Sequence, residues 1–198
     1  MSTSAAPRTA SLPSKALVAF VVGAFALAAC GSSSYGGSKT APSTTVPNAR
    51  TLLATALREM SNGQTDQAQS DFEEVLRLDP ENKYAYYNLG YIAQTGGHDA
   101  DAETQYRHSL AIDPKFEPAL YNLAILRADA GATGDAIGLY RQAIAAKAKD
   151  ANAHFNLGLL LRKTGKTDEG NAEITLAVQL DPSLKSKAAA QGVPGITG

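Results

Sequence analysis

The chain has 198 residues, of which 44% are hydrophobic and 19% are charged, and its formal net charge is −1. These values are typical of a globular protein and exclude disorder along the whole chain. The balance of 18 basic against 19 acidic residues leaves no basic stripe for a phosphate backbone. The composition therefore argues against a nucleic-acid-binding protein.

Residues 1–29 have the layout of a secretory signal peptide. Arg8 and Lys15 precede an uncharged apolar run that ends in small residues at Ala29. This run covers residues 16–29, which is shorter than the about 20 residues that a transmembrane helix needs. The segment therefore predicts export of the chain rather than a helix that spans the membrane.

Cys30 is the only cysteine of the chain and closes the sequence Leu27-Ala28-Ala29-Cys30. This segment resembles the lipobox of bacterial lipoproteins, in which the cysteine receives a diacylglyceryl group and becomes the new N-terminus after cleavage. The resemblance implies diacylglyceryl and N-acyl lipid on Cys30 and a lipid-anchored protein on the extracytoplasmic face of a bacterial cell membrane. The alternative is an ordinary signal peptide cut after Ala29, which leaves Cys30 as a free thiol with no second cysteine to pair with.

Residues 30–48 form the next segment, which is rich in Gly, Ser, Thr and Pro and holds almost no aliphatic side chains. Such a composition cannot build a core, so it predicts a flexible tether. A tether of this length spans on the order of 25 Å.

From Ala49 onward the sequence repeats itself every 34 residues without insertion or deletion. The units are residues 49–82, 83–116, 117–150 and 151–184. The apolar spacing within each unit is helical, so each unit is predicted to be a pair of helices. Glycine ends the first helix, at Gly63, Gly97, Gly131 and Gly165. Proline ends the second helix in three units, at Pro80, Pro114 and Pro182.

Three other columns recur at this period. Polar residues expected to cap the second helix are Thr65, Asp99, Thr133 and Thr167. Small residues expected at the contact between helices are Gly90, Ala124, Gly158, Ala68, Ala102 and Ala136. Large residues expected to fill the space between units are Phe72, Tyr106, Tyr140 and Ile174.

These small, aromatic and proline columns resemble the tetratricopeptide repeat family. The resemblance implies an all-α fold, a right-handed α-solenoid of four antiparallel helix pairs in which the first helices line a concave groove. The chain departs from the pattern at Ala148, which replaces a proline, and at Gly170, which replaces an alanine. The missing proline predicts a weaker bend, or a continuous helix, over residues 141–161.

A binding groove on the first helices is the candidate functional site that the resemblance implies. Its aromatic side chains suit apolar contact with a protein or peptide partner, and its asparagine amides suit hydrogen bonds to an extended backbone, although a role in helix packing stays open for the asparagines. The groove residues are Leu53, Leu57, Tyr84, Tyr87, Asn88, Tyr91, Tyr121, Asn122, Ile125, Phe155, Asn156, Leu159 and Arg162. The basic residues of the family's carboxylate clamp are missing, so an apolar or mixed ligand is expected.

No enzyme is predicted, because the three histidines are scattered and no catalytic, metal-binding or cofactor-binding spacing is present. His154 is expected to be a packing residue. The predicted function is that of a membrane-anchored adaptor, with a self-associating assembly platform or a regulatory subunit in cell-envelope biogenesis as the alternatives. Self-association depends on residues 185–198, a short partial cap and tail that either covers the last repeat or leaves Ile174 and Val178 exposed.

Overall fold

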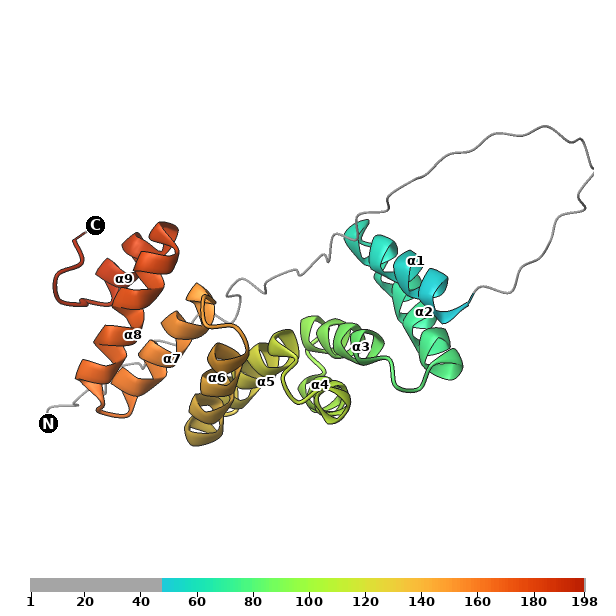
Figure 1. Ribbon diagram of the computed structural model, residues 1–198, viewed down its shortest axis with the longest axis horizontal. Coiled ribbons are helices and arrows are strands. Elements are labelled where there is room, and N and C mark those ends of the chain that lie inside the picture. Colours follow the sequence, from blue (N-terminus) through green and yellow to red (C-terminus); the bar gives the residue numbers. More distant parts are fainter. Residues whose placement is uncertain (1–47, 198) are drawn as a thin grey trace, which may run out of the picture. The chain divides into compact units, whose positions relative to one another are not determined.

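The computed structural model describes residues 48–197, and all of the regular structure in that range is helical (Figure 1). Cys30, the signal segment and nearly all of the tether lie outside the described residues. The helices are α1 (Ala49–Ser61), α2 (Thr65–Leu78), α3 (Lys83–Thr95), α4 (Asp99–Ile112), α5 (Glu117–Asp129), α6 (Thr133–Ala146), α7 (Ala151–Lys163), α8 (Thr167–Leu180), the 3₁₀ turn η1 (Pro182–Leu184) and α9 (Lys185–Ala190). The predicted all-α fold of four helix pairs is confirmed.

Consecutive helices pack as hairpins, α1 on α2, α3 on α4, α5 on α6 and α7 on α8. The second helix of each hairpin also packs on the first helix of the next hairpin. Buried clusters therefore cross the hairpin boundaries: Phe72 shares one with Ala85, and Tyr140 shares another with Leu157. A single hairpin could not bury its apolar face, and the stack supplies the missing partner.

The large column lies in the core, as the sequence predicts. Phe72, Tyr106 and Ile174 are fully buried and Tyr140 is 2% exposed. Glycine at position 90 is a packing requirement, because a Cβ there would lie 2.8 Å from the ring of Tyr106. The small and large columns are therefore complementary parts of one helix contact.

Tight turns join the two helices of each hairpin. The four turn glycines have φ between 76° and 83°, a conformation that other residues rarely adopt. The residue after each glycine closes the turn with a backbone bond to the preceding helix, as in Gln64 N–H to Glu59 C=O at 2.9 Å, which is a Schellman motif. The predicted caps are wrong: Thr65 and its counterparts are already the first helical residues, and the N-cap residues before them make no side-chain bond.

Gly170 and Gly158 set the approach of α7 and α8. A Cβ on Gly170 would lie 2.6 Å from Arg162 Cγ and 2.6 Å from the Gly158 carbonyl oxygen. Alanine, the usual residue of the family column, therefore does not fit in the fourth unit.

Gly170→Ala is expected to lower the free energy of unfolding by about 1–3 kcal/mol, because the added methyl forces two helices apart. The matched control is Gly138→Ala, since a Cβ on this helical glycine meets nothing within 4 Å. The control should raise stability by roughly 0.5–1 kcal/mol through helix propensity. Urea denaturation followed by circular dichroism measures both, and a similar change in the two variants would contradict the packing argument.

The turn at Ala148 corrects the prediction of a weaker bend. Helix α6 ends at Ala146, and its C-cap Lys147 has φ −143° and ψ 87°, close to the −134° and 96° of Asp113 before Pro114. The turn after α6 is closed by a hydrogen bond from the Asp150 N–H to the Lys147 C=O at 3.1 Å. It matches the bond from the Phe116 N–H to the Asp113 C=O, at 3.0 Å, in the turn after α4. Proline is thus not needed for this turn, because side chains described below hold it.

The C-terminal segment covers the last repeat. Leu184, Ala188 and Val193 are buried in one cluster with Ile174 and Ala177. The side chain of Arg162 helps to hold this cap, because its Nη2 donates to the Gln191 carbonyl oxygen at 2.8 Å. Ile174 is fully buried and Val178 is partly buried against the same cluster, so the exposed end that would have favoured self-association is not present in the described residues.

Candidate partner-binding site

The first helices carry the expected groove residues, and the structure divides these residues into three groups. Tyr84 is exposed, with 47% of its surface accessible. Partly buried are Leu53, Leu57, Asn88, Tyr91, Ile125, Asn156, Leu159 and Arg162. Buried, with exposures of 2% to 8%, are Tyr87, Tyr121, Asn122 and Phe155.

The buried asparagine and tyrosine side chains bond to one another inside the stack. Asn122 Nδ2 donates to the hydroxyl oxygens of Tyr87 at 3.3 Å and Tyr106 at 3.2 Å. One repeat further on, Asn156 Nδ2 donates to the hydroxyl oxygen of Tyr121 at 3.0 Å. Burial is the main reason that the pKa of Tyr87 is raised to about 12, so the hydroxyl stays neutral. These bonds tie the third hairpin to the second and the fourth hairpin to the third.

Four expected contact residues are therefore corrected to packing residues. Tyr87, Tyr121 and Phe155 occupy one column at the 34-residue period, and none of them faces solvent. Tyr87 and Tyr121 share buried clusters with the next hairpin, and Phe155 shares one with α8 and the C-terminal segment. The Asn122 amide nitrogen donates to the hydroxyl oxygens of two buried tyrosines, so this side chain has no donor left for a peptide. Arg162 is corrected as well, because it bonds Asn171 Oδ1 at 2.8 Å in addition to the C-terminal cap.

The accessible part of the first-helix face is centred on Tyr84. We call Tyr84, Asn88 and Tyr91 the Tyr84 surface, because they lie on successive turns of α3. The Tyr84 ring meets Phe116 edge to face, with centroids 5.5 Å apart, and Lys83 Nζ lies 5.2 Å from the Tyr84 ring centroid. The ring is thus held in place on one side and open to a partner on the other, which suits an aromatic anchor for binding.

Two hairpins are closed by charge pairs of opposite polarity. In the second unit, Lys83 at the start of α3 bonds Asp113 at the end of α4, with 2.5 Å between Nζ and Oδ2. In the third unit, Glu117 at the start of α5 faces Lys147 at the end of α6, with 3.8 Å between Oε2 and Nζ. The acid and the base have exchanged places, which explains why the third unit has Lys147 where the second unit has Asp113 before Pro114.

Asp150 completes this second pair. Its Oδ2 accepts from Lys147 Nζ at 3.1 Å and its Oδ1 accepts from the Ala153 N–H at 2.9 Å, so it caps α7.

Burial, followed by the hydrogen bond to Asp150, raises the pKa of Glu117 to about 7. Although burial opposes it, hydrogen bonds from Ala153, Glu117 and Lys147 lower the pKa of Asp150. The raised pKa of Glu117 and the lowered pKa of Asp150 favour one shared proton, which Glu117 carries and donates to the Asp150 carboxylate. Sequence reasoning missed this pair, although the exchanged charges at the 34-residue period were its signal.

The shared proton predicts a pH-dependent stability. The pKa of Glu117 is raised from 4.5 in the unfolded chain to about 7 in the fold, so its stabilising contribution is complete below 4.5 and is lost as pH rises toward 7. From about pH 5 to about pH 8, the free energy of unfolding should fall by on the order of 1–2 kcal/mol more in the natural chain than in Glu117→Gln, allowing for screening by Lys147 and solvent. Urea titrations at the two pH values measure this, with exposed Glu81→Gln as the control. Parallel pH profiles for the natural chain and Glu117→Gln would contradict the shared proton.

His154 is a packing residue, as expected. It is 5% exposed, its Nδ1 lies 2.6 Å from Glu173 Oε2, and its Nε2 lies 3.2 Å from the Ala148 carbonyl oxygen. These contacts hold the turn at the position of the missing proline.

Within residues 48–197 there is no group of three or more possible metal ligands. The same range contains no helix with the length and apolar character needed to cross a membrane.

The fold and the Tyr84 surface first define a class of protein, a repeat scaffold whose stacked helical hairpins present side chains to partners. The sequence profile of the tetratricopeptide repeat matches residues 53–115 and 121–184, and the chain belongs to this family. Family membership makes the chain a scaffold for protein–protein interaction. A comparison with curated proteins gave no match.

Solved structures with the same fold include MamA, which is 24% identical over 71% of this chain and 81% of its own, with a TM-score of 0.62. PilF of Pseudomonas aeruginosa is 21% identical over 72% of this chain and 66% of its own, with a TM-score of 0.64. YrrB, described as a TPR protein with an unusual peptide-binding site, is 18% identical over 75% of this chain and 80% of its own, with a TM-score of 0.62. These identities establish a shared fold and leave the partner to be found.

Proposed function

We propose that this protein is a membrane-anchored, extracytoplasmic adaptor that binds a protein or peptide partner through the Tyr84 surface. The observation that carries the proposal is the exposure of Tyr84, which at 47% is the largest among the exposed large hydrophobic residues within residues 48–197. An aromatic ring held by Phe116 and Lys83 loses little side-chain entropy when a partner covers it. YrrB, the related fold with a peptide-binding site, is consistent with a peptide as the ligand.

The anchor in this proposal rests on the sequence around Cys30, which lies outside the described residues. One acyl chain holds a protein only marginally, whereas two or more give stable attachment at about 0.8 kcal/mol for each buried methylene. A lipidated Cys30 and the tether of residues 31–48 would hold the repeat domain close to the membrane. The alternative of self-association through the last repeat loses its support, because Leu184, Ala188 and Val193 cover that end.

The test is photo-crosslinking in native membranes, with a photoreactive amino acid in place of Tyr84 and, as the matched control, in place of Leu176. Leu176 is 38% exposed on α8 and lies away from the Tyr84 surface. A discrete crosslinked species is expected at position 84 alone. Affinity capture of the same partner without crosslinking should fall by about tenfold in Tyr84→Ala with Asn88→Ala. Equal crosslinking at both positions would place the binding surface elsewhere. Tyr87→Ala with Tyr121→Ala is unsuitable, because both rings are buried and their loss would report on stability.

A further inference from the structure

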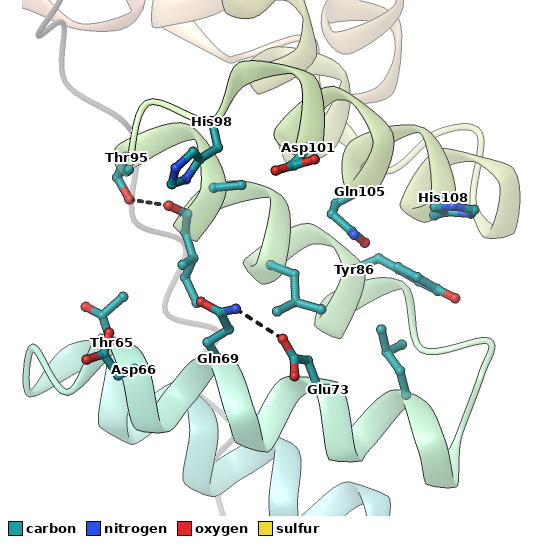
Figure 2. A pocket seen from close by; sticks show the side chains of 15 residues that line it. Thr65, Asp66, Gln69, Glu73, Tyr86, Thr95, His98, Asp101, Gln105 and His108 are labelled. Carbon is teal, nitrogen blue, oxygen red and sulfur yellow. Dashed lines mark hydrogen bonds between the residues drawn. The ribbon is translucent and has the colours of Figure 1, made fainter.

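A groove of about 880 Å³ lies between α2, α3 and α4, which is within the size range of ligand sites (Figure 2). Its floor is α3, with Leu89, Ile92 and Ala93, and its walls are α2 and α4. The residues that line it are different from those of the Tyr84 surface, although both surfaces use α3. At one end of the groove, the rings of Tyr86 and His108 stack with centroids 5.1 Å apart and planes 24° from parallel.

The same position between the second and third hairpins is occupied by an arginine of the protein itself. Arg127 on α5 bonds Glu103 on α4 at 3.2 Å and Asp135 on α6 at 2.9 Å. One repeat earlier, the counterpart of Arg127 is Ala93, which lines the groove. The groove is therefore open where an arginine closes the next junction.

The junction between the third and fourth hairpins is also closed by an arginine, because Arg141 on α6 bonds Glu169 on α8. The counterparts of this pair two repeats earlier are Glu73 on α2 and Asp101 on α4, so two acids line the groove where the later junction has an ion pair.

The acids of the groove have no basic partner across it. None of the described lining residues is Lys or Arg, and no hydrogen bond or ion pair among them crosses from α2 to α3 or α4. The one side-chain bond on the α2 wall runs along the helix, from Gln69 Nε2 to Glu73 Oε1 at 3.1 Å (Figure 2). Gln105 Oε1, on the α4 wall, is buried without a hydrogen-bond partner. The groove thus combines unneutralised carboxylates with an unused acceptor.

We propose that this groove binds an arginine side chain from an extended segment of a partner protein. The guanidinium takes the place between α2 and α4 that Arg127 takes in the next junction. The counterparts of Glu103 and Asp135, the partners of Arg127, are Gln69 and Asp101, so the guanidinium pairs with Asp101 and, on the α2 wall, with Glu73 one turn after Gln69. Arginine suits the site better than lysine, because its planar fork bridges two carboxylates and stacks on flat rings such as those of Tyr86 and His108. An apolar neighbour of the arginine lies on Leu89 and Ile92.

The test uses the full-length chain in detergent and a fluorescein-labelled peptide of sequence Gly-Leu-Arg-Leu-Gly with blocked ends. A second peptide carries citrulline, which has the shape of arginine without its charge. Fluorescence anisotropy at low salt should show at least about tenfold tighter binding of the arginine peptide. Ala93→Arg should weaken that binding by about tenfold or more, because the new side chain supplies the guanidinium from within.

Three further variants keep the test independent of any folding defect. Asp101→Asn should weaken arginine-peptide binding about three- to tenfold, whereas Asp168→Asn, which removes an exposed acid from the first turn of α8, should leave it unchanged. Tyr84→Ala should also leave it unchanged, so this site and the Tyr84 surface fail or succeed separately. Equal binding of the two peptides, or equal binding by the natural chain and Asp101→Asn, would overturn the proposal. So would self-association of the chain that Ala93→Arg abolishes, since the occupant would then be a second copy.

Discussion

Replacement of Cys30 with alanine is expected to release the whole protein from the membrane. In the proposed anchor, the thiol of Cys30 is the only attachment point for lipid, because the chain has no second cysteine. Without acyl chains the apolar contribution of about 0.8 kcal/mol for each methylene is lost entirely. The variant should therefore move from the membrane fraction to the soluble extracytoplasmic fraction.

Metabolic labelling with radioactive palmitate distinguishes loss of the lipid on residue 30 from a simple sorting defect. The natural chain should incorporate label and Cys30→Ala should not, while Ser32→Ala, a small change two residues further on, should behave as the natural chain does. Absence of label from the natural chain would refute the anchor and favour an ordinary signal peptide cut after Ala29.

Asn122→Ala is expected to cause the second large effect, a loss of about 2–3 kcal/mol in the free energy of unfolding. Asn122 is 2% exposed and supplies the donor for two buried hydroxyl oxygens, on Tyr87 and Tyr106. Its removal leaves both oxygens without that donor and opens space between the second and third hairpins. The thermal midpoint should fall by roughly 5–10 °C, measured by circular dichroism.

Asn88→Ala is the matched control, because Asn88 holds the same column one repeat earlier. It is only partly buried, and its Nδ2 donates to the Tyr84 carbonyl oxygen of its own helix at 2.7 Å. Its loss should cost less than about 0.5 kcal/mol. If the two variants were equally stable, the buried network would not be what joins the hairpins.

The fold could be predicted from the sequence because the 34-residue period fixes helix length, turn position and core columns together. Gly63 and its counterparts each need a left-handed turn, and Phe72 and its counterparts each need the space between helices. The turn caps could not be predicted in the same way. Thr65 has the chemistry of a cap, but the Schellman turn is so short that Thr65 is already helical.

The candidate site was predicted only in part, since resemblance to a family says which helices face a partner but not which side chains stay accessible. Tyr87, Tyr121 and Phe155 form a column that remains aromatic in three successive units, which is a sign of packing. Tyr84 stands in a column that changes to Pro118 and then to an asparagine, which is a sign of exposure. The groove at Ala93 required the structure, because its meaning depends on what Arg127 bonds in the next repeat.

The exchanged charge pairs, Lys83 with Asp113 and Glu117 with Lys147, also determine how the repeats can be recombined. A hybrid hairpin made from α3 and α6 would bring two lysines together, and one made from α5 and α4 would bring two carboxylates together. At this position α3 therefore does not accept α6 and α5 does not accept α4, so single helices of the second and third units are not interchangeable. Gene rearrangements that cut inside a hairpin should be selected against, whereas cuts between whole hairpins keep every pair intact.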